Sequence, residues 1–193
     1  MKLKLFGKKQ LTGLLLACSL LPTIVDAQIC NPSALVTTPS TRFIDNNDGV
    51  IIDTKTNLMW QKCTDGQSGD NCSTGSATSY SWQQALQRVD NLNNTSGFSN
   101  YVDWRLPNAK ELLSLMERSC IEPAINLQVF PNINGSNSDL WSSTPYLQAP
   151  NSNERALVAG FSGLGGIIDT MKIYNRAIRL VRNATPTPNI GAY

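Results

Sequence analysis

The sequence contains no histidine, and this absence removes several familiar kinds of active site. Serine and cysteine nucleophiles are commonly activated by a histidine base, and catalytic zinc is commonly held by histidine, so only rarer arrangements are left. We also find no pair of carboxylates to nominate for glycosidic cleavage. The sequence therefore predicts a protein that is not an enzyme and has no resident cofactor.

Repeats and an excess of one charge are also missing. There is no collagen-like Gly-X-Y run, heptad pattern or internal repeat. The whole chain has 16 basic and 14 acidic residues, but residues 1–27 hold four of the lysines and one aspartate. The remaining 12 basic and 13 acidic residues give a net charge of −1, so we expect no nucleic-acid partner.

Residues 1–27 have the pattern of a cleavable signal peptide. Four lysines precede an apolar run at 11–21, and Val25-Asp26-Ala27 follows as a cleavage site. The run is too short for a membrane anchor, so we do not expect an integral membrane protein. An alternative is lipoprotein processing at Cys18, which the unsuitable Leu16 disfavours. We expect an exported protein, located in the periplasm, at the cell surface or outside the cell.

Four cysteines follow the predicted leader, at positions 30, 63, 72 and 120. An even number in an exported protein predicts two disulfides, and four cysteines allow three pairings. The 166 residues after the leader suit one domain with one core. We place that domain at residues 28–183 and expect residues 184–193 to be a flexible tail.

Hydrophobic periodicity and turn residues predict an α+β fold with two helices, short antiparallel strands and long loops. A hairpin is expected over 43–52, around the turn Asn46-Asn47-Asp48-Gly49. Helices are expected from Ser81 and over about 109–119, each with a capping box. Later strands are expected at 140–143, 155–161, 166–169 and 177–182, and strands from the two ends of the chain can pair.

The segment 103–112 predicts a strand, a stop and a capped helix in ten positions. In an extended segment Asp103 and Arg105 share one face and can pair, while Trp104 points into a core. Asn108 can accept from the amide of Glu111 while Glu111 reaches back. The other tryptophans, Trp60, Trp82 and Trp141, also sit among apolar residues, so we expect core packing rather than sugar stacking.

Six ordered blocks carry a resemblance to a known family. They span residues 43–49, 53–63, 81–86, 103–112, 140–143 and 178–182. Over about residues 40–183 the chain resembles the Lcl C-terminal domain family, named for the terminal domain of a Legionella collagen-like adhesin and formerly a domain of unknown function. The resemblance implies a C-type-lectin-like fold, shared with formylglycine-generating oxidases. With loop geometry, it favours the pairings Cys63–Cys72 and Cys30–Cys120.

Acidic and amide residues in the hairpin superficially resemble a calcium loop, because Ca²⁺ takes clustered oxygen ligands. The candidate ligands are Asp45, Asn47, Asp48 and Asp53. Their spacing does not match an EF-hand, since Gly49 comes one position early. A hairpin turn of residues that tolerate left-handed backbone is the favoured alternative.

Tyrosine- and asparagine-rich loops late in the chain suit adaptable recognition. The candidate ligand-binding residues are Tyr146, Asn151, Asn153, Lys172, Tyr174, Asn175 and Arg176. Ordinary solvated loops are the alternative reading. In lectin-like folds this late region supplies the ligand face.

These observations favour an exported, non-catalytic recognition module, such as an adhesin domain that binds a glycan or a cell-surface protein. The namesake of the family implies sulfated polysaccharide binding, whereas this chain is not basic without its leader. An alternative is an oxidase-type enzyme of the same fold, which would need a reactive cysteine pair. A third hypothesis is a structural subunit of a surface or pilus assembly.

Overall fold

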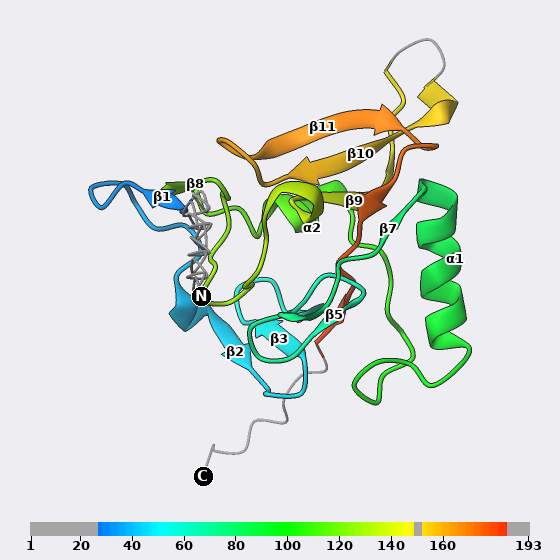
Figure 1. The fold of residues 1–193 in the computed structure, drawn as a ribbon, viewed down its shortest axis with the longest axis horizontal. Coiled ribbons are helices and arrows are strands. Elements are labelled where there is room, and N and C mark those ends of the chain that lie inside the picture. The colour runs from blue at the N-terminus through cyan, green and yellow to red at the C-terminus, as the bar shows by residue number, and fades with distance from the viewer. Residues whose placement is uncertain (1–26, 149–151, 185–193) are drawn as a thin grey trace, which may run out of the picture.

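The computed structural model describes residues 27–148 and 152–184 (Figure 1). The predicted signal peptide apart from Ala27, and the predicted tail apart from Ala184, lie outside the described residues. Within the described ranges, no helix is both long and apolar enough to cross a membrane.

Two α-helices, thirteen strands and three short 3-10 helices make up the described fold. The helices are α1 (Trp82–Asn93) and α2 (Ala109–Leu113), with 3-10 helices at Ser40–Arg42, Gly135–Asn137 and Ser152–Glu154. The strands are β1 (Ile29–Cys30), β2 (Phe43–Asp45), β3 (Val50–Asp53), β4 (Leu58–Gln61), β5 (Gln67–Ser68), β6 (Thr74–Gly75), β7 (Ser79–Tyr80), β8 (Cys120–Ile121), β9 (Asp139–Pro145), β10 (Arg155–Gly160), β11 (Gly166–Met171), β12 (Arg176–Ala177) and β13 (Val181–Asn183). The predicted α+β class is confirmed, whereas the lectin-like fold stays a prediction.

The strands form two main sheets. One has the order β11-β10-β9-β12-β7 and the other β13-β4-β3-β2, with small extra pairs β1-β8 and β5-β6. Figure 1 shows β9, β10 and β11 on one side of the molecule, β2 and β3 on the opposite side, and α1 along a flank. The predicted pairing of early and late strands is confirmed, because Val181 of β13 lies opposite Trp60 of β4.

Both predicted helix starts are confirmed, but the second helix is shorter than expected. Capping boxes form at Ser81 of α1 and Asn108 of α2. The prediction that α2 continues to residue 119 is wrong, because the helix ends at Leu113. The next amides bond three residues back, as in the bond of Leu115 N to Leu112 O, and the chain then bridges to Ile125. The apolar residues that follow the helix therefore remain buried, although their backbone is not α-helical.

The predicted strand over 177–182 is divided into β12 and β13. One carbonyl in the gap accepts from the loop after β4, and another accepts from the last residue of β4. Ile178 O accepts from Asp65 N at 3.0 Å, and Leu180 O accepts from Gln61 N at 3.0 Å. Arg179 between them is fully buried and donates to the carbonyl oxygens of Gln61 and Lys62. This segment joins the two sheets.

Tryptophan packing follows the prediction closely. The indoles of Trp60, Trp104 and Trp141 are buried in the core. Trp82 is only partly buried, and its Nε1 donates to the carbonyl of Ser142 at 2.8 Å. Because indoles supply much apolar area, three of them fix the core of a small domain.

The predicted ion pair between Asp103 and Arg105 is wrong. Arg105 instead binds Glu111 at 2.7 and 2.8 Å, and Asp103 binds Arg182 at 2.6 and 3.0 Å. A bridge between Arg105 and Val181 brings β13 alongside this segment. Arg182, which is distant in the sequence, is therefore better placed to pair with Asp103 than Arg105 is.

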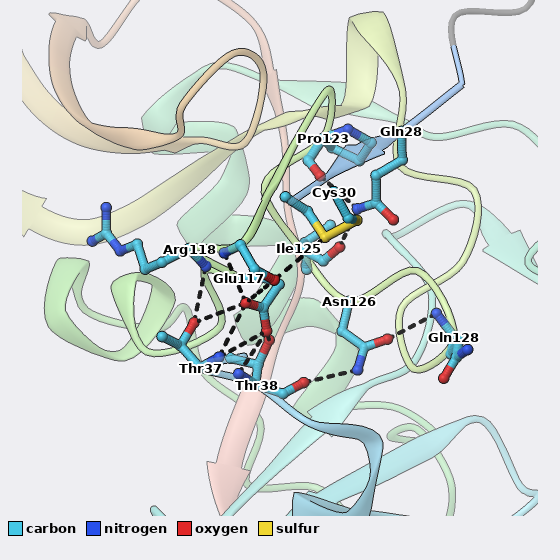
Figure 2. The surroundings of a disulfide bond; sticks show 12 residues. Gln28, Cys30, Thr37, Thr38, Glu117, Arg118, Pro123, Ile125, Asn126 and Gln128 are labelled. Carbon is cyan, nitrogen blue, oxygen red and sulfur yellow. Dashed lines mark hydrogen bonds between the residues drawn. A yellow bond between two sulfur atoms is a disulfide. The ribbon is translucent and has the colours of Figure 1, made fainter. Parts of the chain in front are cut away.

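Both predicted disulfides, Cys30–Cys120 and Cys63–Cys72, are confirmed. Figure 2 shows the first beside the carboxylate of Glu117, with Thr37 and Thr38 close to it. The amides and hydroxyls of Thr37, Thr38 and Ser119 all donate to that carboxylate. The disulfide and this cluster of hydrogen bonds together attach the N-terminal segment to the domain.

Candidate functional site

A cavity of about 520 Å³ opens between the β2–β3 turn and the loop closed by Cys63–Cys72. Its lining comprises Asp45 and residues 47–49 of the turn, residues 61–70, Arg88 of α1, and Phe98. Four further clefts have volumes from 270 to 420 Å³. The first cavity lies within the size range of small-ligand pockets, and its wall combines charged, amide and aromatic side chains.

Pairing of β3 with β4 brings the turn and the loop together. Val50 lies opposite Gln61, and the amide of Lys62 donates to the carbonyl of Gly49 at 2.8 Å. The chain then enters the loop, which the Cys63–Cys72 disulfide closes and the β5-β6 pair braces. Figure 1 shows this loop beside β3. Two segments with turn-rich sequences thus become facing walls.

Phe98 forms an apolar wall close to the β2–β3 turn. A Cβ atom on Gly49 would lie 3.0 Å from Phe98 Cζ, and the φ angle of Gly49 is +89°. Both facts favour glycine at this position, because left-handed backbone and close approach exclude a side chain. Ser99 Oγ donates to the carbonyl of Asp48 at 3.1 Å, and Trp104 packs edge-to-face on Phe98. Phe98 is therefore held in place by the ring of Trp104 and by the hydrogen bond from its neighbour Ser99 to the turn.

Two aspartates of the cavity are engaged by basic side chains. Lys62 Nζ lies 2.7 Å from Asp45 Oδ2. Burial alone would raise the pKa of Asp45, but hydrogen bonds from Lys62 and from the Asn47 amide outweigh it, so this pKa is lowered. Arg88 binds Asp65 through two contacts of 3.0 Å. These pairs tie the turn to the loop and the loop to α1.

The hydroxyl of Tyr80 completes the contacts of Asp65, to which it donates at 2.6 Å. Burial raises the pKa of Tyr80, and the hydrogen bond to Asp65 raises it further. Tyr80 therefore keeps its proton at neutral pH and acts as a fixed donor.

Carboxylates outnumber cations in the lining. The acidic residues are Asp45, Asp48, Asp65 and Asp70, and the basic ones are Lys62 and Arg88. Four negative and two positive formal charges give a net charge of −2. Among the described residues, Asp48 and Asp70 form no ion pair. The cavity thus presents uncompensated negative charge to solvent.

The structure separates the four candidate calcium ligands. Asp45, Asn47 and Asp48 line the cavity, but Asp53 lies opposite Phe43 at the far end of the hairpin. The buried Asp53 carboxylate is paired with Arg42. In the part of the chain that is described, no three or more His, Cys, Asp or Glu residues group closely enough to hold a metal ion. Calcium binding by Asp45, Asn47 and Asp48 stays a prediction, but Asp53 is not placed to take part in it.

The candidate ligand-binding residues of the late loops lie elsewhere. Lys172 Nζ donates to the carbonyl of Asn153 at 2.6 Å and lies 4.4 Å from the centre of the Trp82 ring. These contacts join two of the predicted residues.

The other late-loop candidates are arranged less closely. The guanidinium of Arg176 lies 6.0 Å from the ring centre of Tyr174 and 3.4 Å from Asp139, and it donates to the carbonyl of Asn175. The amide of Tyr146 donates to Arg155 O, and Asn151 falls outside the described residues. None of the five clefts is lined by these residues.

Sequence reasoning missed most of the cavity. The sequence predicts the turn as a candidate site and the Cys63–Cys72 bridge as a structural element. The pairing of β3 with β4 was the signal that could have placed the turn beside the disulfide loop. Strand register fixes which loop residues become neighbours. No local pattern indicated that Arg88 and Phe98 complete the wall.

Comparison with known proteins gives one family match. The model of the Lcl C-terminal domain matches residues 49–182. No curated protein matches the chain. The matched range includes the loop 61–70, Arg88 and Phe98, whereas Asp45, Asn47 and Asp48 precede it.

Proposed function

The chain belongs to the Lcl C-terminal domain family, and we propose that it is an exported, non-catalytic recognition module that binds a glycan or a protein at the cell surface or in the periplasm. The family supports a surface or adhesin-type module. The two disulfides support folding in an oxidising compartment. The expected lectin-like fold belongs to the same proposal.

One observation carries the binding role, namely the cavity between the turn and the disulfide loop. Its volume of about 520 Å³ suits a short oligosaccharide or a peptide segment. The walls are fixed by a disulfide, by the Lys62–Asp45 pair and by the Arg88–Asp65 pair. A pre-formed wall favours binding because less side-chain freedom is lost when the ligand arrives.

The same contacts favour binding over catalysis. Asp45 and Asp65 are engaged by cations, and Tyr80 is held in its protonated form. A general base must instead be free to take a proton near neutral pH. Asp45, Asp65 and Tyr80 therefore act as fixed acceptors and donors, which suit recognition.

An oxidase-type activity is the second candidate, because the Cys63–Cys72 disulfide adjoins the cavity and Cys63 lines it. A catalytic pair would need an accessible sulfur with thiolate character. Cys63 and Cys72 are 8% and 0% exposed, which favours a structural bridge. Alkylation of the native protein after brief mild reduction separates the candidates, since a redox-active pair reacts under conditions that leave Cys30–Cys120 intact.

The proposal is tested by filling the cavity. Ser68→Trp places a bulky ring on an exposed part of the lining, and Ser33→Trp makes the same change at an exposed serine outside it. Arrays of neutral glycans, sulfated polysaccharides and surface proteins are probed with and without calcium. We expect Ser68→Trp to lose a ligand that the parent and Ser33→Trp retain. Equal retention by all three proteins contradicts binding in the cavity.

A further inference from the structure

The charge distribution of the cavity narrows the class of ligand, in a step that rests on the proposed recognition function. The lining carries a net formal charge of −2. Arg179 is a further cation in contact with the wall, because it donates to the carbonyls of Gln61 and Lys62. It does not line the cavity, and even with Arg179 included the net charge is −1. A positively charged ligand is therefore attracted.

The two carboxylates without ion pairs lie on opposite walls. Asp48 belongs to the β2–β3 turn, and its Oδ1 accepts only a 3.3 Å contact from the amide of Val50. Asp70 is exposed near the end of the disulfide loop. Because their charges are uncompensated by neighbouring cations, they are available to a ligand, whereas Asp45 and Asp65 already hold Lys62 and Arg88.

A bare metal ion does not fit this arrangement well. The carboxylates of the described residues do not form a group of three that could surround one ion, and an oxygen cage for Ca²⁺ needs six to eight close ligands. The cavity instead has a volume of about 520 Å³, with Phe98 as an apolar wall. Separated carboxylates with an aromatic wall suit a long aliphatic chain that ends in an ammonium or guanidinium group.

Sulfated polysaccharides are disfavoured at this cavity for the same electrostatic reason. Their sulfate groups would approach Asp48 and Asp70, and like charges at an interface reduce both the rate of encounter and the affinity. Lys62 and Arg88 do not offset this repulsion, because each is held by its own aspartate.

We propose that the cavity binds a lysine- or arginine-bearing segment of a partner protein, with the basic side chains directed to Asp48 and Asp70 and their aliphatic parts against Phe98. The volume of about 520 Å³ exceeds the needs of one side chain, so a short peptide segment is the expected occupant. The association should weaken as salt rises, because exposed charges are screened over about 8–10 Å at physiological ionic strength.

The test is an NMR titration of the ¹⁵N-labelled domain with acetyl-trilysine amide, with acetyl-triglutamine amide as the neutral match. The amides of Gly49, Gly66 and Gly69 report on the cavity, and Gly163 reports on a remote loop. Cellotriose and heparin are titrated in the same way. We expect trilysine alone among the four probes to shift the three cavity glycines, with less effect at 300 mM than at 50 mM salt.

Charge-neutralising variants assign the effect to the two carboxylates. Asp48→Asn keeps an acceptor for Val50 N, and we expect its combination with Asp70→Asn to weaken trilysine binding about tenfold or more. Asp90→Asn, an exposed change on α1 outside the cavity, should leave the affinity within about twofold of the parent. Retained amide dispersion and an unchanged Gly163 signal in the free variants confirm that the fold is retained.

The outcomes separate this inference from the proposed function. If heparin or cellotriose shifts the cavity glycines and trilysine does not, the cationic class is wrong and the recognition site stands. Equal binding of trilysine by the parent and the double variant also overturns the cationic class. If none of the probes moves the cavity glycines and Ser68→Trp leaves all array binding unchanged, the cavity is not the recognition site and both proposals fall.

Discussion

The carboxylate of Glu117 is expected to be a principal support of the N-terminal attachment. Its side chain accepts from the amides of Thr37, Thr38 and Ser119 at 3.0, 2.7 and 2.9 Å, and from the three hydroxyls of the same residues. Glutamine at this position keeps the shape but replaces one acceptor oxygen by an amide group that itself donates. Donors on that side would then lose their partner and face another donor (Figure 2).

The magnitude follows from the pKa of Glu117. Burial would raise this pKa, but hydrogen bonds from Thr37, Thr38 and Ser119 outweigh it and lower the pKa from 4.5 to about 2. Because the folded state binds the proton less readily than the unfolded state, the carboxylate stabilises the fold above the unfolded pKa. That difference corresponds to roughly 3 kcal/mol, and it is lost as the pH falls from about 4.5 toward 2.

Urea unfolding of the oxidised domain measures this contribution. At pH 7 we expect Glu117→Gln to lower the free energy of unfolding by about 3 kcal/mol, and the gap to the parent should narrow between pH 5 and pH 2. Glu154→Gln changes an exposed carboxylate and should stay within about 0.5 kcal/mol of the parent. A Glu117→Gln effect below about 0.5 kcal/mol, or a gap that does not depend on pH, refutes the reasoning.

Three further stability predictions use the same assay. Arg42→Met should lower the free energy of unfolding by about 3–5 kcal/mol because it leaves the buried Asp53 carboxylate unpaired, and adding Asp53→Asn should restore part of the loss. A loss below about 1 kcal/mol for Arg42→Met contradicts this reasoning. Gly66→Ala should cost about 1–3 kcal/mol, since φ is +91° and the new Cβ would lie 2.4 Å from a backbone oxygen; unaltered stability would show that the loop adapts. Replacing both Cys30 and Cys120 by alanine should cost about 4–5 kcal/mol, because the bridge spans 90 residues, and a loss under about 1 kcal/mol is inconsistent with the chain-entropy account.

Local signals in the sequence predicted local structure well. The capping boxes at Ser81 and Asn108 form because both partners lie within one helical turn. Trp104 is buried as expected, since its neighbours already define an extended segment. The even number of cysteines predicted two bridges, and the family resemblance with loop geometry selected their pairing.

Contacts between distant segments were the part that sequence could not supply. Asp103 binds Arg182 rather than Arg105, because β13 returns alongside residues 103–105 only in the folded chain. The cavity has the same origin, since Phe98 meets the β2–β3 turn through the packing of another loop. Side-chain patterns report on the nearest few residues, whereas tertiary neighbours depend on sheet order and register.

The measurement that tests the central claim most directly is ligand binding by the parent, Ser68→Trp and Ser33→Trp domains on one array of glycans, sulfated polysaccharides and basic peptides. The account predicts a ligand, expected among the basic peptides, that the parent and Ser33→Trp bind and that Ser68→Trp loses. Equal binding of every retained ligand by all three proteins would contradict recognition through the cavity.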